Sequence, residues 1–184
     1  MDISMSTVLV RTILEHAEDH PWVIQEIGLL GLRLDDEREY RLHVWDPDSI
    51  SGEPPVHDHP FAFTSTVIAG EMTNTRYEED PLGVEYHRVR YTPPNEADRR
   101  SDTVRLSGTA TTIAAGSQYH QQPHELHDSR QVPGTVTVIR MTFTPTMPEL
   151  TVCHREPRPW VSGRSRPAPR ADVTRITAAA LDLF

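Results

Sequence analysis

The chain contains 184 residues, with ten histidines, one cysteine and a formal net charge of −9 at pH 7. This length suits one domain with its own core, and a single cysteine excludes an intramolecular disulfide framework or a zinc cluster built from cysteines. The acidic balance argues against a nucleic-acid partner, and the complete absence of lysine excludes Schiff-base chemistry and a phosphate-binding P-loop. Neither a signal-peptide pattern nor an apolar run of membrane-spanning length is found, so we expect no membrane association and a cytoplasmic location.

Residues 1–37 are predicted to form a helical segment that packs on the outside of a larger fold. Apolar residues follow Ser6 at a spacing close to 3.6, and Ser6 is suited to cap the helix that they form. Pro21 then interrupts the pattern. A second short apolar segment over residues 22–31 ends in glycine, as helices often do.

From residue 38 the pattern changes to the alternation of a β-strand. The first strand is predicted to carry Tyr40, Leu42 and Val44 on one face, and Arg41, His43 and Trp45 on the other. Similar short runs, separated by Gly, Pro, Asn and Asp, predict an all-β sandwich or barrel over residues 38–154. Residues 91–102 are predicted to be an exposed loop between two of these runs.

The C-terminal part, residues 155–184, is predicted to be an extended arm followed by a short helix. Proline and arginine are frequent in the arm, which favours an extended path over the surface. Asp172 is expected to cap the helix, and Val173 and Ile176 are expected on its apolar face.

Two histidines, His57 and His59, stand one residue apart in the segment PPVHDHPFAF. On a strand, this spacing places both imidazoles on the same face, where they can bind one metal ion. Two polar residues in a solvated loop have the same spacing, so the neighbouring sequence has to distinguish these alternatives. A strand that ends at Gly70 follows directly. Farther along the chain, a segment rich in histidine offers His120, His124 and His127.

This arrangement resembles the two sequence motifs of the cupin family. The first motif combines a glycine, the HxH pair and a glycine that ends a strand, and the second combines a glycine, a proline and one more histidine. The matching positions are Gly52, His57, His59 and Gly70 in the first motif, and Gly116, Pro123 and His127 in the second. The resemblance covers residues 38–152 and implies an all-β jelly-roll barrel that holds one divalent metal ion. Helices at the N-terminus and a short C-terminal helix would flank it.

The third histidine of the cluster is chosen by its position in the chain. If residues 119–127 are extended, His127 shares a face with Gln121, whereas His120 and His124 lie on the opposite face. His127 also directly precedes a turn and a strand, as the last histidine of the cupin motif does. We therefore favour His127 over His124 as the third ligand, and His120 is less favoured still.

Two positions after the HxH pair depart from the usual cupin pattern. Many cupins carry a glutamate ligand four or five residues after the pair, where this chain has Phe63 and Thr64. A site of three neutral histidines resembles that of the thiol dioxygenases, which implies iron(II) with an anionic substrate and O2 in the open positions. Zinc, nickel and manganese also suit a site of this kind.

Other positions differ from the thiol dioxygenases and leave the substrate open. Thr64 stands where the mammalian enzymes have their cross-linked cysteine, and Phe143 stands near the position of their catalytic tyrosine. No arginine matches their carboxylate-binding residue, and Arg33 and Arg41 are the nearest candidates. Cysteine is therefore not carried over as the substrate, and the resemblance leaves room for cleavage of diketones or phenolic acids.

These observations predict a metal-dependent enzyme, a non-heme iron(II) dioxygenase with His57, His59 and His127 as metal ligands and catalytic residues. Its substrate is expected to be a small anionic or chelating molecule inside the barrel, with O2 as co-substrate and a homodimer as the oligomeric state. The candidate pocket residues are Arg41, Phe63, Tyr119, Gln121 and Arg140. The alternatives are a metal-dependent isomerase, lyase or hydrolase, and a barrel that binds a small molecule without catalysis.

Several of the noticeable residues fit ordinary packing at least as well as function. Phe61, Phe63 and Trp45 suit the core better than a substrate pocket, and Arg140 fits an outward ion pair equally well. Cys153 is expected to be a buried, unreactive residue of a strand.

Overall fold

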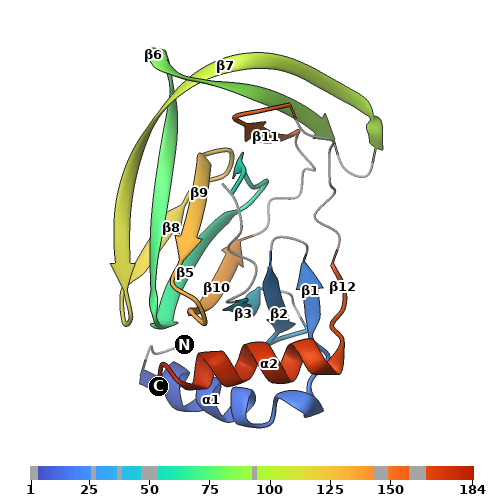
Figure 1. Cartoon of the computed structure of the whole chain (residues 1–184), viewed down its shortest axis with the longest axis vertical. Coiled ribbons are helices and arrows are strands. Elements are labelled where there is room, and N and C mark those ends of the chain that lie inside the picture. The colour runs from blue at the N-terminus through green and yellow to red at the C-terminus, as the bar shows by residue number, and fades with distance from the viewer. Residues whose placement is uncertain are drawn as a thin grey trace.

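The computed structural model describes residues 4–25, 28–36, 39–46, 54–92, 95–142, 149–157 and 165–184. In these ranges the chain forms two antiparallel β-sheets, and the helices α1 (Ser4–Glu15) and α2 (Arg170–Leu181) pack against each other at one end (Figure 1). No helix of the described residues is long and apolar enough to cross a membrane.

A 3-10 turn, η1 (Ala17–Asp19), follows α1, and the strands come between it and α2. The strands are β1 (Val23–Gln25), β2 (Leu29–Arg33), β3 (Tyr40–Trp45), β4 (Val56–His57), β5 (Ala62–Ala69), β6 (Glu71–Thr92), β7 (Asn95–Ala114), β8 (Gln118–Gln121), β9 (Leu126–Gln131), β10 (Val136–Thr142), β11 (Leu150–His154) and β12 (Arg166–Pro167). The seven-stranded sheet has the order β12-β1-β2-β3-β10-β5-β8, and the five-stranded sheet has the order β11-β4-β9-β6-β7.

The eight strands from β3 to β10 have the pairing of a jelly roll. The first pairs with the last (β3–β10), the second with the seventh (β4–β9), the third with the sixth (β5–β8), and the fourth with the fifth (β6–β7), all antiparallel. This nested pairing folds one long hairpin over into two facing sheets. The predicted all-β jelly-roll fold is therefore confirmed, and β1, β2 and β12 extend one of its sheets.

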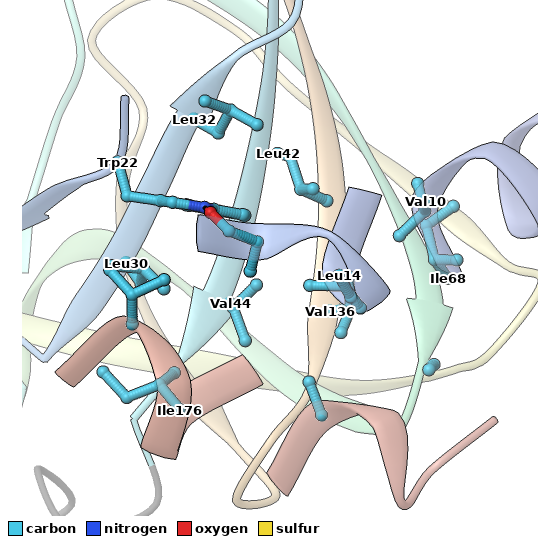
Figure 2. Packing of buried hydrophobic residues seen from close by; sticks show 14 residues of the cluster. Val10, Leu14, Trp22, Leu30, Leu32, Leu42, Val44, Ile68, Val136 and Ile176 are labelled. Atoms are coloured by element: carbon cyan, nitrogen blue, oxygen red, sulfur yellow. Dashed lines mark hydrogen bonds between the residues drawn. The ribbon is translucent and has the colours of Figure 1, made fainter. Parts of the chain in front are cut away.

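The largest apolar cluster lies between the helices and the outer face of the seven-stranded sheet (Figure 2). Leu42 and Val44 of β3 and Ile176 of α2 are fully buried there. Burying each such side chain contributes roughly 1.5–3 kcal/mol. Since side chains alternate along a strand, the intervening residues of β3, Arg41 and His43, face the opposite side, toward the five-stranded sheet. The predicted alternation along this strand is confirmed.

The second apolar segment near the N-terminus, residues 22–31, was predicted to be helical, and this prediction is wrong. The segment contains β1 and the first part of β2; β2 pairs with β1 on one side and with β3 on the other. Leu29, Leu30 and Leu32 are all buried, so β2 has an apolar side chain on each face. A strand buried on both faces is a continuous apolar run, and over so few residues periodicity does not separate it from a helix.

Both helix starts also differ from the prediction. The helix α1 begins at Ser4, so Ser6 lies within it and does not cap it. Pro169 stands at the N-cap of α2 and makes no side-chain hydrogen bond there, while Asp172 lies in the first turn. A carboxylate in the first turn still favours a helix, because it faces the positive end of the helix dipole.

Residues 91–102 are mostly strand, and the predicted loop there is wrong. The strand β6 runs to Thr92 and β7 begins at Asn95, which makes one long hairpin that curves over the end of the barrel (Figure 1). The polar sequence is held as strand by its neighbours, because β11 pairs with β6 and Asp102 accepts hydrogen bonds from Arg88 and Arg90. Cys153 of β11 is fully buried beneath this hairpin, in a cluster with Val104 and Leu106.

Candidate metal centre

The side chains of three histidines converge in the interior of the barrel, from the paired strands β4 and β9 and from the loop that follows β4. His57 of β4 pairs directly with His127 of β9, and His59 follows two residues after His57. One ring nitrogen from each histidine lies within 4.8 Å of the others. The shortest separation joins the Nε2 atoms of His59 and His127, at 3.1 Å.

Hydrogen bonds on the far side of two of the rings determine which nitrogen faces the centre. The Nδ1 atom of His57 lies 3.0 Å from the carbonyl oxygen of Pro55, and that of His127 lies 2.8 Å from Oδ1 of Asn74. Since both partners are acceptors, each Nδ1 carries the proton, and each Nε2 keeps its lone pair. This is the outer support that metal-binding histidines generally have.

All three imidazoles are neutral at pH 7. Burial lowers the pKa of His127 to about 2, and the adjacent His57 and the guanidinium of Arg76 act in the same direction. Burial also lowers the pKa of His57, and burial together with the neighbouring histidines holds the pKa of His59 well below its usual range. The neutral ring is the form that binds a metal.

The donor set and its spacing suit a divalent ion. Two nitrogens that each lie about 2.0–2.1 Å from one ion are separated by no more than about 4.2 Å, so the pair at 3.1 Å fits directly. The outer limit of 4.8 Å for the three donors exceeds this span by roughly 0.6 Å, which a small rotation of one ring can close. In the metal-free protein, a proton on Nε2 of His59 can bridge to Nε2 of His127. An ion would replace that proton.

Aromatic rings cover one side of the three histidines. Phe63 of β5 is 3% exposed, and its ring centre lies 5.2 Å from that of His59 and 5.9 Å from that of His127. Phe61 lies 5.3 Å from His59, and Tyr119 lies 5.8 Å from Phe63. These rings exclude water, which strengthens electrostatic interactions at the cluster.

The loop that carries His59 is fixed from the other face of the sheet by Asp58. One carboxylate oxygen of Asp58 accepts a hydrogen bond from the backbone N–H of Thr151 at 2.7 Å, and its own N–H donates to the carbonyl of Thr151 at 3.1 Å. The other carboxylate oxygen lies 3.3 Å from Nδ1 of His124. The backbone N–H of His124 also donates to the carbonyl of His59 at 2.9 Å.

The structure brings His127 together with the HxH pair and leaves the two other candidate histidines outside the cluster. His124 contacts Asp58 on the opposite face of the sheet. His120 is exposed on β8, where its Nδ1 lies 3.2 Å from Oγ1 of Thr64. The preference for His127 thus agrees with the geometry.

Gln121 and His127 do not lie on one face of a single extended segment, and that prediction is wrong. The strand β8 ends at Gln121 and β9 begins at Leu126, and the two strands belong to different sheets. His124 lies between them with a φ of 62°, which breaks the extended path. Gln121 and Tyr119 nevertheless face the same interior from the opposite sheet, because Gln121 pairs with Phe63 and Tyr119 contacts its ring.

The remaining predicted positions fall on both sides of the barrel wall. Arg41 faces the interior, where its charge contributes to the lowered pKa of His59. Arg140 is exposed on the outer face of β10, beside the ring of Tyr40, so it does not line the pocket. Its strand neighbours Ile139 and Met141 occupy the alternate positions, and Met141 is buried. Arg33 is exposed.

The glycines of the cupin-like motifs serve backbone turns where the structure describes them. Gly70 and Gly116 have φ values of 81° and 83°, which favour glycine. At Gly70 a Cβ atom would lie 2.5 Å from Oγ1 of Thr135, so a larger residue would clash as well. Gly52 and Phe143 lie outside the described residues.

Two functional candidates were missed in the sequence. Asn74 is 3% exposed and holds His127, but on the sequence it is only one polar residue in a long strand. His43 was placed on the correct face of β3 without a role. A signal for both was available: each is a polar residue at an inward position of an alternating strand.

Cys153 is a buried residue of a strand, as expected. Burial raises its pKa to about 12. The nucleophilic thiolate is therefore scarce at neutral pH.

Comparison with known proteins leaves the family open. No family model and no curated protein matches the chain. Among solved structures, the chain is similar to the oxalate decarboxylase of Lactobacillus farciminis in its formate complex, with 12% identity and a TM-score of 0.38 over 77% of this chain. It spans only 32% of that enzyme. It is also similar to CENP-C of Drosophila melanogaster bound to CAL1, with 9% identity and a TM-score of 0.40 over 77% of this chain and 100% of that one.

At such low TM-scores, neither likeness carries an argument about function. What the chain itself provides is the nested pairing of eight strands and three histidines that converge inside it. Together these make it a cupin-like jelly roll with a cluster of side chains that could bind a divalent metal.

Proposed function

We propose that the protein is a non-heme iron(II) dioxygenase whose metal is held by His57, His59 and His127. The observation that carries the proposal is the set of three neutral imidazoles, two of them fixed by Pro55 and Asn74 so that Nε2 faces the centre. A bound divalent ion would keep its full charge among neutral ligands and would supply open positions for a substrate and, as iron(II), electrons for oxygen chemistry.

The residues around the cluster support a small anionic substrate. In four strands of the seven-stranded sheet, the described inward positions carry the cation Arg41 and no carboxylate; these positions are 41, 43 and 45 of β3, 137, 139 and 141 of β10, 63, 65 and 67 of β5, and 119 and 121 of β8. Arg41 would attract and orient a carboxylate. The carboxylates nearest the histidines in sequence, Asp58 and Asp128, lie on the other face of their sheet.

Gln121 would orient a donor group of the substrate. Its side chain is fully buried and donates from Nε2 to the carbonyl of Glu125 at 3.2 Å. Its Oε1 atom is buried and has no hydrogen-bond partner among the described residues. A hydroxyl or ammonium group of the substrate would satisfy it, while Phe63 and Tyr119 keep water away.

Oxygen uptake tests the reaction class. Metal-free protein is loaded anaerobically with iron(II), and oxygen consumption is followed with thiol, diketone and phenolic-acid substrates. We expect uptake in proportion to product in the native protein and in a His124→Asn control, and none in His127→Ala. Turnover without oxygen uptake would instead assign the metal a Lewis-acid role, as in an isomerase, lyase or hydrolase.

A further inference from the structure

The face of β3 that points into the barrel carries two buried nitrogen atoms without a partner. They are Nδ1 of His43 and Nε1 of Trp45, and neither makes a hydrogen bond with any described residue. His43 is 8% exposed. A buried polar group without a partner destabilises the folded state, so native proteins contain few of them.

Both residues belong to the same interior as the three histidines. Leu42 and Val44 of the same strand pack against the helices, so His43 and Trp45 point the other way. The pKa of His59 is lowered in part by the electrostatic influence of His43 and Arg41, which places these two residues near the cluster. On the neighbouring strand β2, His43 pairs with Gly31, so no side chain from that position covers the imidazole.

The available atoms favour an anionic oxygen ligand. The indole N–H of Trp45 can only donate, and a neutral imidazole donates from Nδ1 in one of its tautomers. Arg41, on the same face, adds a positive charge, and no carboxylate occupies the described inward positions of this sheet. Two donors beside one cation match the two oxygens and single charge of a carboxylate better than the higher charge of a phosphate.

We propose that His43 and Trp45 form a binding subsite for a second, distal carboxylate of the substrate. This inference rests on the proposed function, which places the metal-binding end of the substrate at the three histidines. The substrate class is thereby narrowed to dicarboxylic acids and to acids that carry a metal-binding group at their far end. His43 and Trp45 determine specificity and take no part in the chemistry itself.

The indole N–H signal of Trp45 provides a direct test. It is recorded in ¹H–¹⁵N NMR spectra of the full chain, first without metal and then loaded with zinc. The signal is assigned by its loss in Trp45→Phe. The probes are the dicarboxylates from malonate to adipate, with acetate and inorganic phosphate as comparisons. We expect a saturable shift of this signal with at least one dicarboxylate, stronger than with acetate. His43→Phe, which keeps this signal, should weaken binding about tenfold or more.

The controls separate this subsite from packing and from the metal centre. Arg140→Ala, on the outer face, should leave the affinity unchanged. His43→Phe should keep or raise the thermal stability of the ligand-free protein, since it removes an unsatisfied buried group; His43→Gln serves if the bulkier ring does not fold. A dicarboxylate response in protein that fails to bind metal would retain the subsite and reject only the proposed function.

Two results would overturn the subsite. One is a Trp45 signal that no dicarboxylate shifts in zinc-loaded protein. The other is a response to phosphate alone, which would contradict the carboxylate assignment.

Discussion

The two faces of the seven-stranded sheet differ in how completely their side chains are satisfied. On the outer face, Leu42 and Val44 are fully buried among other apolar groups, including Ile176 of α2 (Figure 2). On the inner face, one residue away along the same strand, His43 and Trp45 keep buried nitrogens without partners. One strand can therefore contribute stability through one face and keep unpaired polar groups on the other, because alternate side chains never share a surface.

The strongest test of this division removes packing from the outer face. Leu42→Ala should lower the free energy of unfolding by about 2–5 kcal/mol, because the helices cannot fully close the cavity it leaves. Metal content of the folded variant should not change. Urea denaturation and metal analysis on the same preparation check both parts, and loss of metal from folded Leu42→Ala would show that the two faces are not independent.

Removing the hydrogen-bond acceptor that orients His127 should instead weaken metal binding. Asn74→Ala removes the acceptor for Nδ1 of His127 and should weaken metal binding about 10–100-fold. Asn74→Asp keeps an acceptor and should retain most of the affinity. Ser129→Ala is the matched control, because it loses a longer bond to the same oxygen but leaves the acceptor of His127 in place. Competition with a chelator measures the affinity. Equal binding by Asn74→Ala and the native protein would remove Asn74 from the site.

Inward histidines should also make the metal-free protein sensitive to acid. Burial lowers the pKa of His43 to about 3 and that of His127 to about 2, from a usual 6.5. Below pH 6.5 the unfolded chain takes up these protons and the folded chain does not. The stability from the neutral rings is therefore complete above pH 6.5 and falls as the pH decreases, by about 1.4 kcal/mol per pH unit for each histidine.

Urea denaturation between pH 7 and pH 5 measures this slope. His43→Gln should remove the contribution of His43 and make the curve less steep, while the buried histidines of the cluster keep theirs. A midpoint that does not move over this range would contradict the neutral, buried state of both rings.

The smallest effect is expected at His124, on the far face of the five-stranded sheet. Its ring is half-exposed and lies 3.3 Å from Asp58, an interaction worth at most about 1 kcal/mol. Asparagine is the suitable replacement, because it tolerates the positive φ of this position better than alanine does. Thermal unfolding should change little, and a large loss of stability would show that the Asp58 contact anchors the loop of His59.

The jelly roll and the cluster could be predicted because both depend on local patterns. Alternation along residues 40–45 and glycines at positions of positive φ are properties of short segments, and His57 and His59 lie next to each other in the sequence. What could not be predicted depends on distant partners. The segment 22–31 is a strand because β3 lies beside it, and Asn74 is important because β9 brings His127 to it.

The structure places His127 beside the HxH pair, although one of the two reasons for preferring it failed. The supposed common face with Gln121 does not exist, since a turn at His124 sends the chain from one sheet to the other. The position of His127 directly before a turn and a strand was the better argument, because it reflects its place in the eight-strand order.

Metal content per chain is the decisive measurement for the three-histidine centre. Protein purified without added metal, and then reconstituted with iron(II), is compared with His57→Ala, His127→Ala and the control His124→Asn. We predict about one ion per chain in the native protein and in the control, and almost none in the two cluster variants, all of which should remain folded. A native protein that stays metal-free on reconstitution, or loss of metal in His124→Asn with retention in His127→Ala, would contradict the three-histidine centre.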